Sequence, residues 1–246
     1  MLSEQRTKAI LQALEELRTA SVSQLCSLTG ASEATIRRDL NALAQQRKLN
    51  KVRGGATVIE ITEEVFGKAP ESSRLHLAEK DRIAQYAASL IADDDVVYLD
   101  DGSTVMQMVE YLQTSKALFM TNSIELACRL TWYNLQTRVL GGTLKPGAVN
   151  LVGAEAMASL SRYNFTKAFL GIDGVTVKQG FTAADPETAA VKTLAAERSR
   201  EVYVLADSSK FGQVTAAAVI PLNAAQIITD RLPAPEYREH TVVTEA

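Results

Sequence analysis

Residues that bind metals or form disulfides are scarce in this sequence. Among 246 residues there are two cysteines and two histidines, and none of the four lies close to another. A zinc site needs several such ligands at short spacing, so we expect no bound metal, and no motif calls for a cofactor. Two cysteines far apart, Cys26 and Cys128, fit a reducing compartment, where each is expected to pack as a small buried apolar side chain.

Long apolar runs are also missing. The longest, such as Val202–Ala206, are far too short to span a bilayer. Met1 leads into the polar residues Ser3–Arg6 instead of an apolar segment, so no secretory signal is expected. We therefore expect a cytoplasmic protein without a membrane segment. Internal repeats, low-complexity tracts and heptad runs are absent as well, which excludes fibrous and coiled-coil architectures.

An excess of positive charge, common in nucleic-acid binders, is absent from the chain as a whole. The formal net charge is −3. However, residues 1–56 contain nine basic and five acidic side chains, a balance of +4, so the remainder carries −3 − 4 = −7. A basic head on an acidic body confines the attraction for phosphate to one end of the chain.

The basic head has the pattern of three short helices. Residues 5–17 form the first; Ser21–Gln24 has the form of a capping box that opens the second, which Gly30 ends. Ser32 caps a third helix that extends to about Gln46. The expected apolar stripes are Ile10, Leu14 and Leu17; Val22, Leu25 and Leu28; and Ile36, Leu40 and Leu43. Three such helices with a tight turn before the third predict a helix-turn-helix.

A short basic segment follows the third helix. Lys48–Arg53 is expected to form a strand pair, or wing, turned by Gly54 and Gly55. On the helical wheel the third helix has a small, polar and basic outer face, as a helix entering the major groove of DNA needs. The alternative is an ordinary solvated helix face. The predicted DNA contacts are Ser32, Ala34, Thr35, Arg37, Arg38, Asn41, Gln45, Lys48, Lys51 and Arg53.

Two stretches of the head carry a family resemblance. Ser32-Glu-Ala-Thr-Ile-Arg-Arg-Asp-Leu40 with Leu43, and Arg53-Gly-Gly-Ala56, resemble the signature of the DeoR family of bacterial regulators. The resemblance implies a winged helix-turn-helix and, usually, a repressor of sugar-catabolism operons. One departure is Gln46–Leu49, where the family often has a glycine before the wing.

The rest of the chain alternates strand and helix patterns. This alternation predicts an α/β domain with a mainly parallel, doubly wound sheet. The expected strands are Val96–Leu99, Ala117–Thr121, Thr137–Leu140, Lys167–Ile172, Glu201–Ala206 and Gln226–Thr229, with one more short strand possible after Pro233. The expected helices are 80–92, 104–113, 124–132, 154–162 and 187–198. We expect a DNA-binding domain at 1–56, a linker at 57–78 and a ligand-binding domain at 79–246.

Polar residues follow several of these strands. Asp101–Thr104 comes after a strand and opens a helix, where free amides attract an anion and Gly102 allows close approach. Ligands of open parallel sheets bind beyond the strands' carboxyl ends, and lysines suit a phosphate as carboxylates suit sugar hydroxyls. For Glu187 and Lys192 a merely solvated helix position is equally plausible. The predicted effector contacts are Asp101, Gly102, Ser103, Thr104, Thr121, Asn122, Ser123, Gly142, Asp173, Glu187, Lys192 and Lys210.

The family resemblance extends to about Gly212. Its sensor-domain motifs are similar to Asp101–Thr104, Thr121–Ser123, Gly141-Gly142, Gly171–Gly174 and Asp207–Lys210. The resemblance implies a fold like that of ribose-5-phosphate isomerase and a sugar-phosphate ligand. It assigns phosphate to Gly102, Ser103 and Thr104, and sugar contacts to Asp173 and Lys210. Val105 and Asn150 stand where the family often has threonine and serine.

Two functions fit these patterns. In the first, a phosphorylated sugar binds the second domain of a homodimer or homotetramer and changes its affinity for double-stranded operator DNA. In the second, the body is an isomerase-like sugar-phosphate enzyme, because Asp173, Glu187 and Lys210 supply an acid, a base and a cation. We favour the regulator, with no catalytic residues, since both histidines lie outside every motif and binding explains the same side chains.

Overall fold

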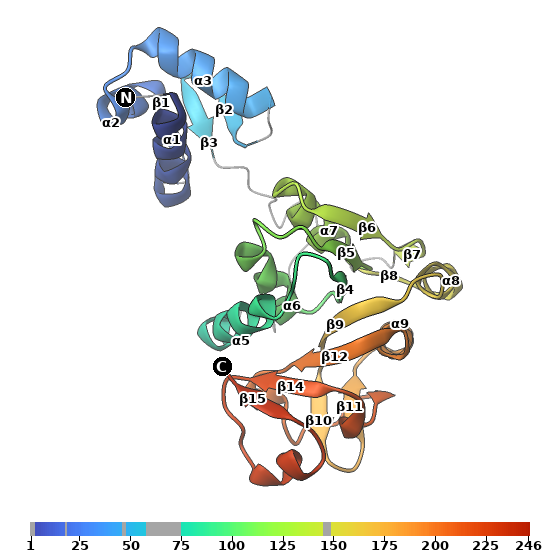
Figure 1. Ribbon diagram of the computed structural model, residues 1–246. Helices are drawn as coiled ribbons and strands as arrows, with labels where there is room; N and C mark the ends of the chain where they lie inside the picture. Colours follow the sequence, from blue (N-terminus) through green and yellow to red (C-terminus); the bar gives the residue numbers. More distant parts are fainter. Residues whose placement is uncertain (1–2, 18, 46–47, 58–74, 145–148) are drawn as a thin grey trace. The chain divides into compact units, whose positions relative to one another are not determined.

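The computed structural model describes most of the chain (Figure 1). The described stretches are 3–17, 19–45, 48–57, 75–144 and 149–246. The chain divides into two compact units, residues 1–65 and 66–246, and each is described by itself. The predicted linker lies largely within 58–74, outside the described residues, so the predicted domain boundaries stay predictions.

Unit 1 begins with the three expected helices. α1 spans Ser3–Leu17, α2 spans Val22–Thr29 and α3 spans Glu33–Gln45. Their apolar stripes meet in one core with residues of the wing. The buried members of this core are Ile10, Ala13, Leu14, Ala20, Val22, Leu25, Ile36, Leu40, Leu43, Leu49 and Ala56. The helix-turn-helix prediction is confirmed.

The ends of α2 have the predicted chemistry. The Ser21 hydroxyl accepts the amide of Gln24 at 3.2 Å, and the Gln24 side chain accepts the amide of Ser21 at 2.8 Å. This capping box satisfies two amides that a helix start leaves without partners. At the other end Gly30 adopts φ +68°, and its amide donates to the Cys26 carbonyl. Glycine takes this left-handed conformation without strain, which lets the chain turn directly towards α3.

The wing belongs to a three-stranded antiparallel sheet. β1 (Thr19–Ser21) and β2 (Asn50–Val52) pair with opposite edges of β3 (Gly55–Thr57). The predicted wing hairpin is confirmed, but β1 was not predicted, because three residues between two helices show no strand periodicity. The two glycines have different roles. Gly54 turns the hairpin with φ +89°. Gly55 lets β3 approach β1 closely, because a Cβ at this position would lie 2.3 Å from the Ala20 carbonyl oxygen.

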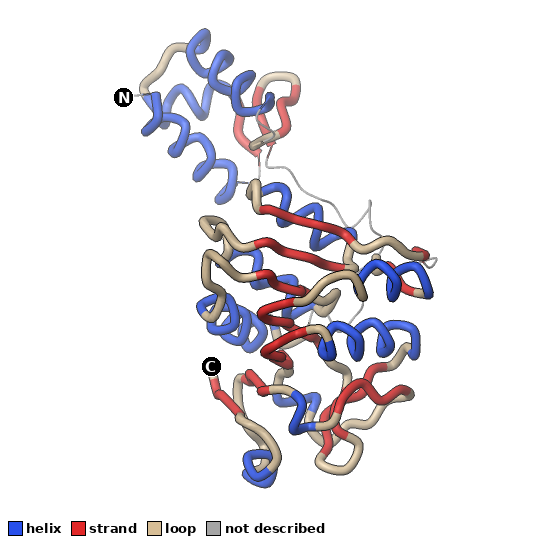
Figure 2. The backbone as a smooth tube through the Cα atoms, turned by 45° about the vertical axis from the view of Figure 1, so that its right-hand side comes forward, coloured by secondary structure: helices blue, strands red, loops and turns tan. Residues whose placement is uncertain are grey.

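Unit 2 is built on a seven-stranded sheet in the order β15-β14-β12-β9-β4-β5-β6 (Figure 2). Every pairing in it is parallel, so the predicted sheet type is confirmed. The strands are β4 (Val96–Leu99), β5 (Leu118–Thr121), β6 (Gln136–Val139), β9 (Phe165–Gly171), β12 (Ser199–Leu205), β14 (Gln226–Thr229) and β15 (Val243–Glu245).

Helices cover both faces of this sheet, as a doubly wound fold requires. On one face lie α5 (Leu77–Ser89), α6 (Ser103–Gln107) and α7 (Ile124–Trp132). On the other lie α8 (Ala154–Leu160) and α9 (Pro186–Glu197). Each face therefore has its own apolar core, with the sheet between them.

Several short elements were not predicted. The predicted helix 104–113 is α6 followed by the 3-10 turn η2 (Met108–Tyr111). β10 (Gly174–Thr176), β11 (Gly180–Ala183) and β13 (Ala217–Ile220) form a small antiparallel sheet, and β7 (Thr143–Leu144) pairs with β8 (Leu151–Val152). These strands have two to four residues each, too few for an alternation of apolar and polar positions to be recognised.

Three expectations of burial are wrong. Leu17 and Leu28 are 56% and 54% exposed. Leu17 is the last residue of α1, and Leu28 lies off the face of α2 that buries Val22, Leu25 and Thr29. Cys128 is exposed on α7 and Cys26 is half-buried, so only the latter packs in part as expected. The small size of a thiol permits burial but does not force it.

Candidate functional site

The strand order of unit 2 reverses between β4 and β9. From β4 the chain adds β5 and then β6 on one side, and it later adds β9, β12, β14 and β15 on the other. Ligands of open parallel sheets bind at such a switch point, beyond the carboxyl ends of the strands. Asp100 directly follows β4 and Ile172 directly follows β9, so these two loops border the position.

Two glycines allow the loops to touch. A Cβ on Gly102 would lie 2.9 Å from the Cα of Gly171, and the reverse distance is the same. No side chain fits between them. The backbone of the loop after β4 therefore rests directly on the end of β9, and this close approach fixes the position of Asp100 and Asp101.

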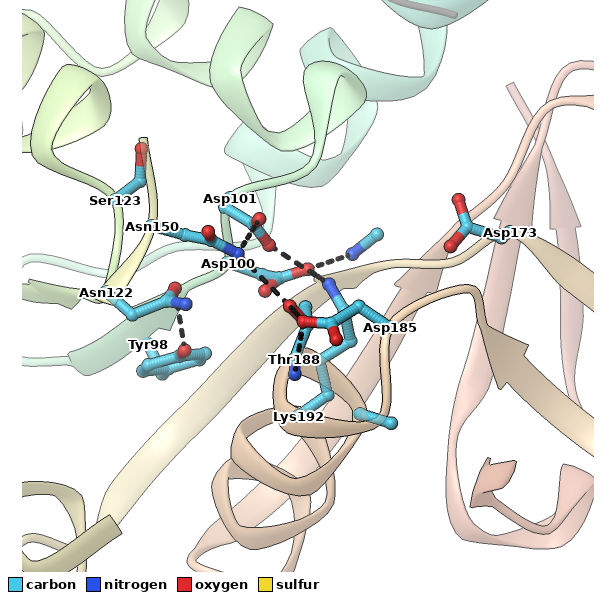
Figure 3. A network of polar contacts seen from close by, with 12 residues as sticks. Tyr98, Asp100, Asp101, Asn122, Ser123, Asn150, Asp173, Asp185, Thr188 and Lys192 are labelled. Carbon is cyan, nitrogen blue, oxygen red and sulfur yellow. Dashed lines mark hydrogen bonds and ion pairs between the residues drawn. The ribbon is translucent and has the colours of Figure 1, made fainter. Parts of the chain in front are cut away.

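A buried lysine lies between two carboxylates at this point (Figure 3). Lys192, from α9, donates from Nζ to Oδ2 of Asp100 and, at 3.1 Å, to Oδ1 of Asp101. The amide of Gly171 donates to the same Asp100 oxygen at 2.9 Å. The other oxygen of Asp100, Oδ1, is buried and has no hydrogen-bond partner among the described residues. The cluster thus holds two acids for one base in an interior position.

The three ionisable groups affect one another strongly. Burial raises the pKa of Asp100 to about 7, because the loss of hydration outweighs the attraction of Lys192. Burial also opposes the charge of Asp101, but Lys192 and hydrogen bonds hold the pKa of Asp101 below its ordinary value. The pKa of Lys192 is raised despite its burial, since both carboxylates favour its charged form. Asp100 is therefore the member of this cluster whose protonation state changes near neutral pH.

Uncharged polar groups continue the network outwards from Asp101. Its Oδ2 accepts Nδ2 of Asn150 at 2.6 Å, and the same nitrogen lies 3.2 Å from the Thr188 hydroxyl oxygen. Asp185 caps α9 by accepting the amide and the hydroxyl of Thr188 at 3.2 and 2.8 Å. Carboxylate, amide and hydroxyl groups are thus gathered from three segments, a set that suits a polyhydroxylated ligand.

The predicted residues after β5 have structural roles. The Thr121 hydroxyl accepts the amide of Ser123, and the Ser123 hydroxyl caps α7 by accepting the amide of Leu126 at 3.2 Å. Asn122 accepts the Tyr98 hydroxyl at 3.0 Å. Thr121, Asn122 and Ser123 are all fully buried. Their predicted contact with an effector stays a prediction.

The other predicted effector residues are dispersed. Asp173 is exposed, accepts the Ala184 amide at 2.8 Å and lies apart from the network of Asp100 (Figure 3). Glu187 is exposed at the start of α9. Gly142 adopts φ +136° and is crowded by Ala156. Ser103 is half-buried and Thr104 buried in the first turn of α6. The structure therefore joins Asp101, Gly102 and Lys192 of the predicted set.

Lys210 belongs to a second charged group at the same edge of the sheet. It follows β12 in a short 3-10 turn, η3 (Ser208–Lys210). Burial lowers the pKa of Lys80, on α5. The negative charge of Asp207 raises this pKa, whereas the positive charge of Lys210 lowers it further. Because the nearby charge of Lys210 disfavours the charged form of Lys80, an anion beside these side chains would stabilise that form.

Several residues of these groups were missed by sequence reasoning. They are Lys80, Asp100, Asn150, Asp185 and Thr188. Asp100 was adjacent to a predicted residue, and an acid directly after an apolar strand was a usable signal. The lysine of α5 and the threonine of α9 carry no local signal, because ordinary exposed helix positions look the same in sequence.

The predicted DNA contacts of unit 1 lie on α3 and the wing. Ala34, Arg37, Arg38, Asn41 and Gln45 are exposed on α3, as predicted from the helical wheel. Lys48, Lys51 and Arg53 are exposed on the wing, while Ser32 and Thr35 contact each other at the start of α3, 3.0 Å apart. The structure thus places the set on neighbouring elements of one unit.

Some of these side chains are already paired. Arg37 contacts Glu33 at 3.3 Å, one turn earlier on α3. Lys51 donates to the side-chain oxygen of Asn41 at 2.7 Å. Arg6, from α1, binds Asp39 at 2.5 Å and so ties α1 to α3. Arg38 is exposed and makes no ion pair with another described residue. Some basic residues of unit 1 therefore hold its helices together, whereas Arg38 is directed to solvent.

Two family models match this chain. The DeoR-like helix-turn-helix domain matches residues 6–62, and the DeoR C terminal sensor domain matches residues 75–231. The chain belongs to the DeoR family. The resemblance seen in the sequence is thereby confirmed, and the protein is a DNA-binding transcriptional regulator.

Curated relatives of this DeoR-family chain are similar over nearly its whole length. The HTH-type transcriptional regulator FruR of Bacillus subtilis is 35% identical over 99% of this chain and 98% of its own. The HTH-type transcriptional repressor GlcR of the same organism is 35% identical, covering 95% and 90%. GlpR of Haloferax volcanii, a transcriptional regulator, is 32% identical, covering 87% and 84%.

Solved structures are similar to parts of this DeoR-family chain. A ribose 5-phosphate isomerase A from Methanocaldococcus jannaschii has a TM-score of 0.41 and 19% identity, over 54% of this chain and 53% of that one. eIF2B beta from Chaetomium thermophilum has a TM-score of 0.42 and 15% identity, over 90% and 64%. No activity of those proteins is carried over to this chain.

No helix in the described stretches of this DeoR-family protein is long and apolar enough to cross a membrane. Within the same stretches, no group of three or more histidine, cysteine or acidic residues could hold a metal ion.

Proposed function

We propose that this DeoR-family protein is a ligand-controlled repressor of a carbohydrate operon, and that its effector is a phosphorylated sugar. The polar network at the switch point of the sheet carries this proposal, since a buried lysine held by Asp100 and Asp101 is joined there to Asn150 and Thr188. One relative, GlcR, is itself named a repressor.

Charge supports one orientation of the effector. The cluster of Asp100, Asp101 and Lys192 has more acid than base, which disfavours an anion beside it and favours sugar hydroxyls. The phosphate lies instead against Gly102–Thr104 and the two lysines, Lys80 and Lys210. α5 and α6 pack against each other on the same face, so one ligand can span these groups.

On DNA, the exposed face of α3 reads base edges and the wing contacts phosphates. The residues that make these contacts are the ones expected from the sequence, between Ser32 and Arg53. A homodimer or homotetramer presents two such heads to a symmetric operator. We propose a cytoplasmic, non-catalytic protein without a cofactor.

The isomerase alternative is not favoured. It needs Asp173, Glu187 and Lys210 to act on one substrate atom, within hydrogen-bond reach of each other. Asp173 accepts an amide from the loop after β11, whereas Lys210 is associated with α5. Measurable turnover of a pentose or hexose phosphate by the pure protein would restore this alternative.

The test is to titrate a panel of sugar phosphates while measuring the affinity for the DNA upstream of the protein's own gene. A tenfold change, about 1.4 kcal/mol of coupling, identifies the effector. We expect Lys210→Met to abolish the effect of the sugar phosphate on DNA affinity and to leave the affinity for DNA alone unchanged. Lys178→Met, at an exposed lysine of the β10–β11 turn, leaves both the effect and the affinity unchanged. Tight DNA binding that no member of the panel changes, in the wild type, would count against a sugar-phosphate effector.

A further inference from the structure

The wing and α3 are joined by one side-chain contact. Lys51, in the middle of β2, donates from Nζ to Oδ1 of Asn41 at 2.7 Å. Both residues are exposed on the surface of unit 1 that carries the DNA-binding helix. The sequence assigned them separate roles, a phosphate contact for Lys51 and a base contact for Asn41.

The chemistry of the pair fixes the orientation of the asparagine amide. A lysine ammonium group donates hydrogen bonds and accepts none. The atom of Asn41 that faces Lys51 is therefore the oxygen, and Nδ2 with its two donors lies on the other side. The oxygen keeps a second lone pair for another donor. The amide is thus held in one of its two flips, with donors and an acceptor still available outwards.

The other charged side chains nearby are arranged differently. Arg37 pairs with Glu33 along α3, and Arg6 with Asp39 inside unit 1. Those pairs neutralise charge or hold helices together. The contact of Lys51 with Asn41 leaves the lysine charge unneutralised and only restricts the rotation of the uncharged asparagine side chain. A held amide loses less entropy when it binds a base edge than a free one.

We propose that Asn41 reads one adenine of the operator and that Lys51 is the positioning residue that holds its amide for this contact. Asparagine recognises adenine with both amide atoms, accepting from N6 and donating to N7. The proposal rests on the binding of DNA by α3. It reassigns Lys51 from a phosphate contact to a determinant of sequence specificity.

The experiment uses the full-length protein and a pool of duplexes with a randomised central segment. Bound duplexes are selected and sequenced for the wild type, N41A, K51M, K51R and the double variant N41A/K51M. The affinity of each protein is then measured for the preferred duplex and for the same duplex with the proposed A·T pair replaced by G·C, at several salt concentrations.

We expect the wild type to prefer adenine at one position of each half-site by roughly tenfold. N41A and K51M lose that preference at the same position, the double variant is no worse than N41A, and K51R, which still donates, retains it. K48M is the matched control, because Lys48 is an exposed lysine at the start of the wing segment, and among the described residues the lysine that donates to Asn41 is Lys51. It weakens binding to all duplexes about equally.

Other results overturn the proposal. If K51M keeps the adenine preference and lowers the salt slope by about 0.9 for each bound head, Lys51 is a phosphate contact. N41A with an unchanged profile shows that Asn41 reads no base. A wild type that selects no sequence at all refutes DNA reading itself, which is distinct from a failure of Lys51 alone. Equal melting temperatures of all variants, expected for exposed positions, separate these results from misfolding.

Discussion

The charge of Asp100 depends strongly on its surroundings. In the unfolded chain an aspartate has a pKa of about 4, whereas burial raises the pKa of Asp100 to about 7 in the folded state. Between these values the folded protein binds more protons than the unfolded chain, so the free energy of unfolding falls as pH rises. Each pKa unit corresponds to about 1.4 kcal/mol.

We therefore predict that unit 2 loses stability between about pH 5 and about pH 7, and that Asp100→Asn removes this loss. The asparagine imitates the protonated acid and keeps an acceptor for the Gly171 amide. Urea unfolding at a series of pH values measures the effect, which is a few kcal/mol at most. Asp94→Asn is the control, since Asp94 is exposed. An Asp100→Asn protein with the wild-type pH slope contradicts the prediction.

Single residues also show where sequence reasoning stopped. The switch-point motif Asp101–Thr104 was visible because an acid and a glycine follow an apolar strand. Asn150 and Thr188 were not predicted as site residues, since Asn150 contacts Asp101 and Thr188 across 49 and 38 positions of the chain. Only the fold brings such residues together, and no spacing within the chain announces it.

Gly102→Ala tests the contact between two strand ends. The added Cβ lies 2.9 Å from the Cα of Gly171, so the loop after β4 has to move away from β9. We predict a loss of effector affinity of tenfold or more, consistent with about 1–3 kcal/mol for overpacking, and an unchanged affinity for DNA without effector. Isothermal titration with the identified sugar phosphate measures the first. Gly141→Ala, whose Cβ meets open space, is the control; equal losses in both variants would refute the argument.

At the scale of elements, the capping box of α2 makes a measurable contribution. Ser21→Ala removes the hydroxyl that accepts the Gln24 amide, and such caps contribute about 1 kcal/mol. We predict a lower midpoint for the unfolding of unit 1 and no change in that of unit 2. Far-ultraviolet circular dichroism during urea unfolding measures the unfolding midpoints of the two units. Ser27→Ala, on the exposed face of the same helix, leaves the midpoint within error or raises it; an equal loss there would show that the cap is not the cause.

The elements that sequence predicted best are those with local signals. α7 and the strands β4 and β14 have the predicted bounds, because caps and apolar runs mark their ends. The antiparallel sheet of β10, β11 and β13 was missed, since each strand is short and β13 pairs with β11 across more than thirty residues. Pairing of that kind is decided by tertiary packing more than by propensity.

At the scale of the whole molecule, only the head has an excess of positive charge, while the net charge of the chain is −3. Affinity for DNA then depends on salt through the head alone, by about 0.9 in logarithmic slope for each phosphate contact. Lys48 and Arg53 are the proposed phosphate contacts that remain after the reassignment of Lys51. Arg162 and Lys178 are exposed basic residues of unit 2 and provide a matched pair.

We predict that the double variant Lys48→Met/Arg53→Met lowers the salt slope, whereas Arg162→Met/Lys178→Met leaves it unchanged. The size of the change reports the number of heads on the DNA, because each head contributes two contacts. A single bound head loses about two units of slope, and two heads of a dimer lose about four. Fluorescence anisotropy of a labelled operator at several salt concentrations measures the slope. Equal changes in the two double variants would mean that unit 2 also binds phosphate, and the proposed division of charge between the units would then be wrong.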